Sequence, residues 1–247
     1  MALYGKVVVV TGAESGIGRA VSLACAADGA TVVAAGLMLE KLESTTEEIR
    51  RRGAKATAVY ADISNPESVS NLFEVTQRSF GKVDAAVANA GIIGDQTPAI
   101  DLSLDNWKRT IEVNLTGTFL TVAAAARILV RQGAGGSILA TGSSAALRPV
   151  PGLMGYAASK GGVHAMMHAL AIELAPHRIR VNTLVPGTTS TEATRNMPGY
   201  LEKAAQSLPL GSVVEADELG RYAAFVLGDS LPHMTGSQLK LDAGRTL

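Results

Sequence analysis

Cysteine, aromatic residues and net charge are all scarce in this chain of 247 residues. The single cysteine, Cys25, cannot form an intramolecular disulfide, and aromatic residues account for only 4% of the chain. The 22 basic residues are balanced by 22 acidic ones, which argues against a protein that binds nucleic acid through a strongly basic surface. The first residues lack the pattern of a secretory signal, and no uninterrupted apolar run approaches the roughly 18 residues of a membrane span. We therefore expect a cytoplasmic protein with a reduced thiol.

Apolar residues and glycine, by contrast, are abundant. Apolar residues make up 47% of the chain and charged residues 18%, which supplies a large buried core and excludes a long charged disordered tail. The 26 glycines suit a fold with many tight turns. At this length we predict a single domain over residues 1–247.

Short runs rich in valine and alanine alternate with helical patterns along the chain. Strands are predicted at 6–10, 31–35, 54–61, 83–88, 137–141, 180–184 and 238–241. Helices are predicted at 17–28, 39–52, 66–80, 105–131, 155–175 and 215–227. Such repeating units predict an α/β fold: a doubly wound parallel sheet of the Rossmann-like kind, with helices on both faces. Between 188 and 213, scattered Pro, Gly, Ser and Thr predict a mobile substrate loop with a short helix.

A glycine-rich turn joins the first predicted strand to the first predicted helix. It reads Gly12-Ala13-Glu14-Ser15-Gly16-Ile17-Gly18. Glycines let the backbone turn sharply and approach a ligand, and the free amides at a helix start favour phosphate oxygens. Because parallel sheets bind ligands at the carboxyl ends of their strands, the turn predicts a dinucleotide site. A purely structural glycine turn is the alternative.

Tyr156 and Lys160 lie four residues apart on a predicted helix, so their side chains share one face. A neighbouring ammonium stabilises a phenolate and lowers the tyrosine pKa from its usual value of about 10. The pair therefore predicts an acid/base couple, whereas a solvated pair on a helix surface is the alternative. The preceding strand ends at Thr141-Gly142-Ser143-Ser144, whose hydroxyls suit either a carbonyl oxygen or the capping of a turn.

These motifs, in this order, resemble the short-chain dehydrogenase/reductase family. The turn has the family's Thr11-Gly12-x3-Gly16-Ile17-Gly18 spacing, and Asn89-Ala90-Gly91 is similar to its Asn-Asn-Ala-Gly element, with Ala88 in place of the first asparagine. Four residues match its catalytic tetrad, with Ser144 as the alternative serine: Asn114, Ser143, Tyr156 and Lys160. Further matches are Asp62-Ile63, Pro186-Gly187, Thr235-Gly236 and Asp242-Ala243-Gly244, so the resemblance covers nearly the whole chain.

The resemblance implies hydride transfer between a nicotinamide cofactor and a secondary alcohol or ketone. Tyr156 would exchange the hydroxyl proton, Ser143 would orient the oxygen, and Lys160 would hold the nicotinamide ribose and lower the tyrosine pKa. Asn114, with a local distortion of its helix, would hold a water linked to Lys160, and an exposed asparagine is the alternative. The implied cofactor contacts are Gly12, Ser15, Gly16, Ile17, Gly18, Leu37, Asp62, Ile63, Asn89, Ala90, Gly91, Tyr156, Lys160, Pro186, Gly187, Thr189 and Thr191.

The choice between NAD and NADP depends on residues after the second strand. There an acidic side chain accepts hydrogen bonds from a free ribose, or an arginine balances a 2′-phosphate. In the family's register these positions are Gly36 and Leu37, and Ser15 stands where phosphate-binding members often carry Arg or Lys. Because Glu14 adds negative charge nearby, we expect NAD. NADP is the alternative if Lys41 or a neighbouring subunit supplies a positive charge.

No metal site is expected. His164 and His168 are four residues apart but lack a third ligand, so we interpret them as helix-surface or subunit-contact residues. Arg148 and Arg195, in segments expected to frame the substrate pocket, either meet an anion or face water.

The substrate itself does not follow from the sequence beyond a small alcohol or ketone, with 3-oxoacyl compounds among the candidates. The small-residue faces of helices 105–131 and 155–175 suit the interface of a homodimer or homotetramer, or only cover the sheet. Two other functions compete: a catalytically idle dinucleotide-binding sensor, and a nucleotide-sugar epimerase or dehydratase, which the chain length disfavours.

Overall fold

A parallel sheet of seven strands forms the centre of the protein. The computed structural model describes residues 2–247. The strand order is β3-β2-β1-β4-β5-β6-β9, and each neighbouring pair is parallel. These strands are β1 (Val7–Thr11), β2 (Thr31–Gly36), β3 (Ala56–Tyr60), β4 (Ala85–Ala88), β5 (Gly136–Thr141), β6 (Ile179–Pro186) and β9 (Gln238–Leu241). The predicted doubly wound sheet is confirmed.

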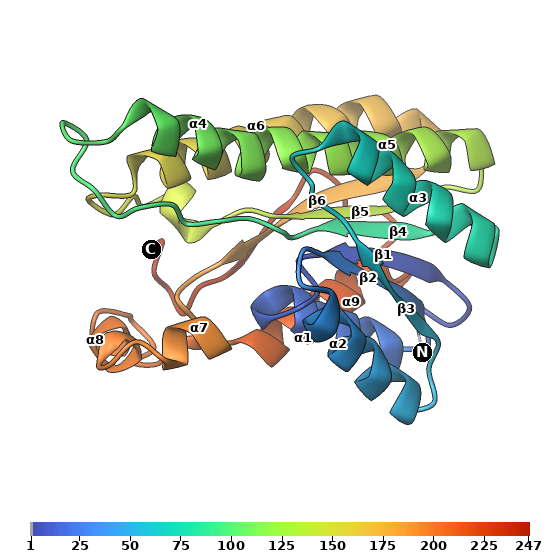
Figure 1. Ribbon diagram of the computed structural model, residues 1–247, viewed down its shortest axis with the longest axis horizontal. Helices are drawn as coiled ribbons and strands as arrows, with labels where there is room; N and C mark the ends of the chain where they lie inside the picture. Colours follow the sequence, from blue (N-terminus) through green and yellow to red (C-terminus); the bar gives the residue numbers. More distant parts are fainter. Residues whose placement is uncertain (1) are drawn as a thin grey trace.

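Helices cover both faces of the sheet. They are α1 (Gly16–Ala27), α2 (Leu39–Arg51), α3 (Pro66–Phe80), α4 (Leu104–Ile111), α5 (Gly117–Gln132), α6 (Met154–Leu174), α7 (Glu192–Arg195), α8 (Tyr200–Gln206) and α9 (Ala216–Leu227), with 3₁₀ turns η2 (Ser144–Ala146) and η3 (Ala175–His177). Figure 1 shows α3, α4, α5 and α6 on one face, and α1, α2 and α9 on the other.

Because an extended strand repeats every two residues, successive side chains point to opposite faces of the sheet. In β1, Val7 and Val9 belong to the core under α3, α5 and α6, whereas Val8 and Val10 belong to the core under α1 and α9. A strand buried on both faces therefore reads as a continuous valine run, which is why the sequence predicted it well.

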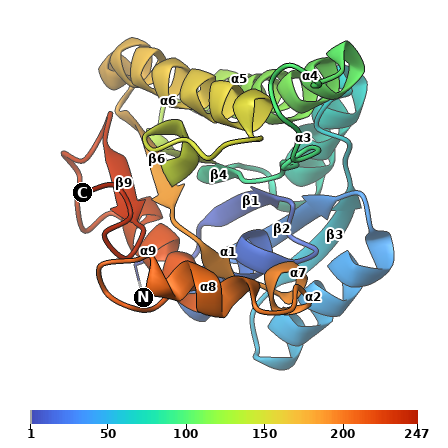
Figure 2. The same ribbon diagram turned by 90° about the vertical axis from the view of Figure 1, so that its left-hand side faces the viewer.

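The strand order places a crevice at the carboxyl ends of β1 and β4. The chain runs outward from β1 to β3, then returns across β1 to start β4. The connections that follow β1 and β4 run over opposite faces of the sheet. They therefore diverge at the carboxyl ends of these two strands and leave a crevice between them. Seen from that side in Figure 2, β1 and β4 lie between the α4–α5–α6 layer and the α1–α7–α8 side.

The helix predicted at 105–131 contains a different turn in its middle. Between α4 and α5 the chain forms a π-helical turn, η1 (Glu112–Thr116), centred on Asn114. By length and composition alone, the stretch Leu104–Gln132 is able to cross a membrane, with mean hydropathy 1.6 over its most apolar window. Half of that window is buried in the fold, where α5 packs on α3 and α6, and core helices of globular proteins pass the same test.

The segment 188–213 is more ordered in its secondary structure than the sequence predicted. Instead of one short helix it holds two, α7 and α8, and begins with a strand, β7 (Thr189–Ser190), that pairs with β8 (Val214–Glu215). The Thr191 hydroxyl accepts from the Thr194 amide, and the Thr194 hydroxyl accepts from the Thr191 amide, which forms a capping box at α7. Pairing between dipeptides this far apart leaves no local pattern, so it escaped prediction. The mobility of the segment stays a prediction.

Candidate active site

The glycine turn after β1 has the geometry that a close backbone approach requires. Gly12 and Gly16 have φ values of +66° and +51°, and residues other than glycine adopt such values only at a cost in free energy. A Cβ atom on Gly18 would lie 2.0 Å from the carbonyl oxygen of Gly12. Gly18 thus lets the start of α1 pack directly on the turn.

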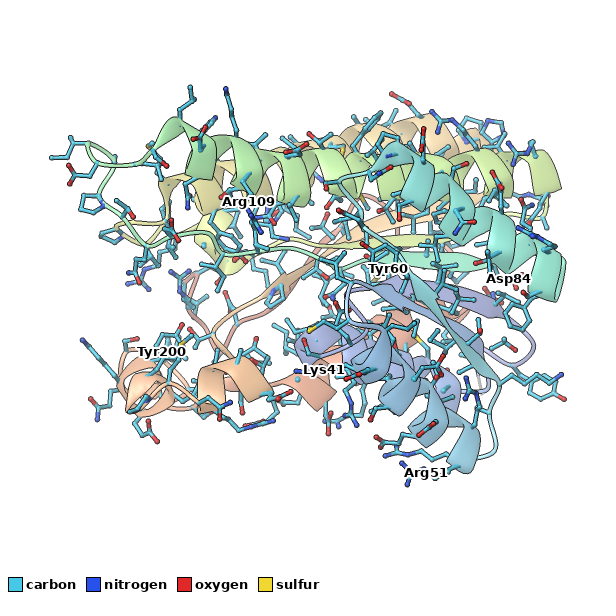
Figure 3. The ribbon with its side chains drawn as sticks, viewed as in Figure 1. Lys41, Arg51, Tyr60, Asp84, Arg109 and Tyr200 are labelled. Atoms are coloured by element: carbon cyan, nitrogen blue, oxygen red, sulfur yellow. The ribbon has the colours of Figure 1, made fainter. Side chains whose placement is uncertain are left out.

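The turn forms one wall of a cavity of about 720 Å³ at the carboxyl ends of the strands. Most of the residues expected to contact a cofactor line it: Gly12, Ser15, Gly16, Ile17, Leu37, Asp62, Ile63, Asn89, Ala90, Gly91, Tyr156, Lys160 and Thr191. Figure 3 shows Lys41 on α2 and Arg109 on α4, on opposite sides of these strand ends, and Arg109 lines the cavity.

Four expected contact residues do not line this cavity: Gly18, Pro186, Gly187 and Thr189. Gly187 follows β6, and its amide donates to the carbonyl of Leu241, while Thr189 starts β7 and donates its hydroxyl to the carbonyl of Gly187. These residues hold the start of the 188–213 segment beside the sheet, and their contact with a cofactor stays a prediction.

A hydrogen-bond network fixes the segment after β4 to its neighbours. The Thr11 hydroxyl accepts from the amides of Asn89 and Ala90, at 3.0 and 3.2 Å. The Asn89 side chain donates to the carbonyl of Thr11 and accepts from the Thr141 hydroxyl at 3.0 Å. The carboxyl ends of β1, β4 and β5 are thereby joined through one asparagine, which explains why a polar residue is needed there.

Asn114 is fully buried, so its interpretation as an exposed asparagine is wrong. Its side chain accepts from the amide of Ile92 at 2.8 Å and donates to the Ile92 carbonyl at 2.7 Å and to the Ser159 hydroxyl at 3.1 Å. The π turn brings this amide to the segment after β4. A Cβ atom on Gly91 would lie 2.9 Å from Asn114 Oδ1 and 3.4 Å from Lys160 Nζ. The absence of a side chain at Gly91 thus leaves a narrow gap between these two polar groups.

Lys160 and Tyr156 share one face of α6 and both line the cavity. The Lys160 amine is buried and donates to the Thr141 carbonyl at 2.7 Å, and burial lowers the pKa of Lys160 to about 8. Its nitrogen lies 5.9 Å from the centre of the Tyr156 ring. The two side chains are therefore neighbours rather than a directly bonded pair.

The pKa of Tyr156 is raised overall in the structure, although the Lys160 amine lies near its ring. Burial raises the pKa of Tyr156 above its usual value, a hydrogen bond with the Ser143 side chain opposes this, and Tyr200 raises the pKa further. Figure 3 shows Tyr200 on α8, on the far side of the strand ends from α4. Sequence spacing reveals the ammonium but not the extent of burial, so the lowering of the Tyr156 pKa by Lys160 stays a prediction.

Ser143, rather than Ser144, is the serine whose side chain lowers the pKa of Tyr156, and a histidine holds its backbone. The Ser143 amide donates to His164 Nε2 at 3.3 Å, and the Ser143 hydroxyl accepts from the Ala145 amide at 3.1 Å. His164 is buried, so its interpretation as a surface residue is wrong, whereas His168 lies at the surface against the Gly236 carbonyl. Gly142 leaves room for this ring, because its Cβ atom would lie 2.2 Å from His164 Nε2.

The two arginines considered for substrate binding both have protein partners. Arg148 donates to the carbonyl of Arg245 at 2.8 Å, and Arg195 donates to the Ser190 hydroxyl at 3.2 Å. Both side chains lie at the surface, which favours their solvent-facing interpretation.

Glu14 also lines the cavity and was noted in the sequence only as a nearby charge. Its Oε1 accepts from the amide of Leu37 at 3.2 Å, and its Oε2 is buried without a hydrogen-bond partner within residues 2–247. Together with the glycine turn, this unpartnered acceptor at the end of β2 suits a ligand that carries phosphates and ribose hydroxyls, as a nicotinamide dinucleotide does.

Comparisons with known proteins agree with this geometry. Residues 12–246 match the family model described as enoyl-(acyl carrier protein) reductase. The chain is 37% identical to an L-rhamnose 1-dehydrogenase (NAD(P)(+)) of Sphingomonas sp. strain SKA58, over 98% of this chain and 96% of that protein. It is 34% identical to a cyclohexanol dehydrogenase of Acinetobacter sp. strain SE19, over 98% and 95%.

A solved structure shares the fold over nearly the whole chain. The crystal structure of a short-chain type dehydrogenase/reductase from Mycobacterium marinum superposes with a TM-score of 0.94 at 36% identity, and the match covers 99% of this chain and 96% of that one. On this match, on the family model and on the parallel sheet with its glycine turn, the chain belongs to the short-chain dehydrogenase/reductase family and is an alcohol/ketone oxidoreductase.

Proposed function

We propose that this enzyme transfers hydride between a nicotinamide cofactor and a secondary alcohol or ketone through Ser143, Tyr156, Lys160 and Asn114. One observation carries the proposal: Tyr156 and Lys160 line the same cavity as the glycine turn, so proton exchange and nucleotide binding take place in one crevice. Bound nicotinamide supplies or accepts the hydride.

In reduction, Tyr156 gives its phenolic proton to the carbonyl oxygen of the substrate. Burial favours the neutral phenol at neutral pH, which is the form this step needs. Ser143, whose side chain also lowers the pKa of Tyr156, donates its hydroxyl to the same substrate oxygen and stabilises its growing negative charge. In oxidation the proton moves the opposite way, from the substrate hydroxyl to the Tyr156 phenolate, while Ser143 keeps its hydrogen bond to the substrate oxygen.

Lys160 and Asn114 support these two groups. The Lys160 amine, held by the Thr141 carbonyl, lies close enough to the Tyr156 ring to favour negative charge there and has further hydrogens for the ribose of the nucleotide. Asn114 fixes Ile92 and Ser159 around the narrow gap at Gly91, where a water would continue the path of the proton from Lys160.

NAD is the proposed cofactor. Gly36, Leu37 and Ser15 carry no positive charge for a 2′-phosphate, and Glu14 would repel one. The relatives named above act with NAD(P)(+) in one case, on L-rhamnose, and on cyclohexanol in the other. A cyclic alcohol, a sugar or a 3-oxoacyl compound is the proposed class of substrate.

We further propose that residues 1–247 work as a single cofactor-binding and catalytic domain, since strands from Val7 to Leu241 share one sheet. The proposed setting is the cytoplasm, in keeping with the free thiol of Cys25, and the proposed assembly is a homodimer or homotetramer through α5 and α6. Size measurement in solution tests the assembly.

The decisive experiment compares Tyr156→Phe with the parent enzyme. We expect the variant to lose turnover by more than about a hundredfold on cyclic alcohols, sugars and 3-oxoacyl thioesters, because the acid/base group is removed. Its affinity for NADH, measured by calorimetry, is expected to change less than about twofold. Turnover that persists within a few-fold would refute the proposed mechanism. A parent that binds cofactor yet turns over none of the panel would instead favour the dinucleotide-binding sensor.

A further inference from the structure

The end of β2 lacks the acidic side chain that would accept a ribose hydroxyl. β2 ends at Gly36, and Leu37 follows it, so neither residue offers a side-chain acceptor. Both residues nevertheless line the cavity. The position that selects between a free ribose and a phosphorylated one is therefore formed without a polar side chain of its own.

A carboxylate from another element fills that position. Glu14, from the turn after β1, accepts from the amide of Leu37 through Oε1 at 3.2 Å. A Cβ atom built on Gly36 would lie only 2.0 Å from Glu14 Oε2. The Glu14 carboxylate thus occupies the volume where a side chain of residue 36 would begin, and glycine at 36 is what makes room for it.

This carboxylate has bonding capacity left over. Oε2 is buried and has no hydrogen-bond partner in the described part of the chain, residues 2–247. No basic side chain within those residues lies at ion-pair distance from Glu14, and Lys41, on the neighbouring helix, pairs with Glu192 at 3.7 Å. A buried carboxylate oxygen without a donor is costly, so the site favours a ligand that brings a hydroxyl.

We infer that Glu14 is the specificity-determining acceptor for the 2′-hydroxyl of the adenosine ribose, in place of an acid at the end of β2. This inference deepens the proposed function and depends on it. A ribose hydroxyl donates to the carboxylate, whereas a 2′-phosphate brings nearly two negative charges against it. Gly36 and Glu14 act as one unit, because each determines what the other position accepts.

The test measures the affinities for NADH and NADPH separately, by calorimetry, in the parent protein and in three variants. Glu14→Gln keeps the shape and the acceptor for Leu37 but removes the charge. Glu14→Ala with Gly36→Asp moves the carboxylate to the strand end. Glu47→Gln is the matched control, because Glu47 is an exposed glutamate on α2 outside the cavity. Thermal unfolding of each variant checks that it is folded.

We expect the parent to bind NADH more tightly, and Glu14→Gln to reduce the NADH-to-NADPH affinity ratio by about tenfold or more. The double variant is expected to restore the preference for NADH, and Glu47→Gln to leave the ratio within about twofold. A folded Glu14→Gln variant with an unchanged ratio would overturn the inference while leaving the proposed function intact. A parent that prefers NADPH would overturn both the inference and the proposed choice of NAD, while leaving the proposed hydride transfer intact. A parent that binds neither nucleotide would overturn the proposed function itself.

Discussion

Replacing Asn114 by alanine removes the clamp between the π turn and the segment after β4. The buried asparagine makes three hydrogen bonds, two to the backbone of Ile92 and one to Ser159. Alanine leaves the amide and the carbonyl of Ile92 without their partners. Each such loss costs about 1 to 3 kcal/mol when the group is buried, and the lower end applies because Ile92 is half-buried and water reaches it.

The expected loss of stability follows from these contacts. With about 1 kcal/mol for each of the three bonds, the free energy of unfolding falls by about 3 kcal/mol. For a chain of this size, 1 kcal/mol corresponds to roughly 2 to 4 °C, so the melting temperature falls by about 9 °C. Thermal unfolding followed by circular dichroism measures it.

The matched control is Asn106→Ala in α4, whose side-chain oxygen has only a weak contact with Thr110 at 3.5 Å. Its melting temperature is expected within about 2 °C of the parent. If Asn114→Ala melted as the control does, the hydrogen bonds of Asn114 would not hold Ile92. Turnover is expected to fall more than the affinity for NADH, because the segment beside Lys160 loosens while the glycine turn is untouched.

Two further predictions concern buried cations and histidine. Arg180 is buried and donates to the carbonyls of Val226, Leu227 and Gly228 at the end of α9. Arg180→Met is therefore expected to lower the melting temperature by about 9 °C, whereas Arg51→Met, at an exposed position, is not expected to lower it. Equal melting temperatures of the two variants would contradict this prediction. Burial, then the charges of Lys160 and His168, lowers the pKa of His164 to about 4. An unfolded chain takes up this proton at about pH 6.5, so the stability that neutral His164 contributes is lost as the pH falls from there towards 4. His164→Gln is therefore expected to flatten the fall in melting temperature between pH 7 and 4.5, and an equally steep fall would refute it.

The fold was largely predictable from the sequence because its strands are buried on both faces. The run predicted at 6–10 is the strand Val7–Thr11, and the other strands of the main sheet were located within a few residues. Such runs stand out between glycine turns and helical patterns. The β7–β8 pair was missed, since two-residue strands have no period to detect, and their pairing depends on the path of the 188–213 segment.

Residues around the proposed catalytic group were predictable only where the amino acid is uncommon in the secondary structure predicted for that position. An asparagine in the middle of a predicted helix signalled Asn114, and the structure explains it by the π turn. His164 gave no such signal, because a histidine on a long helix usually faces solvent. Its role follows only from Gly142, which lets the ring approach the amide of Ser143.

The same limit applies with more force to the end of β2. A comparison of single positions treats Gly36 as the loss of an acid, because it asks only what residue stands at that place. A glutamate side chain spans several ångströms, however, and Glu14 reaches the same volume from the turn after β1. The sequence therefore contains two matched residues. Gly36 has no side chain to exclude the Glu14 carboxylate, and Glu14 reaches this volume from the turn after the neighbouring strand. Only the distance between Gly36 and the Glu14 carboxylate reveals that a negative charge is still present at the end of β2, supplied by another residue. This distance is the reason to expect NAD rather than NADP.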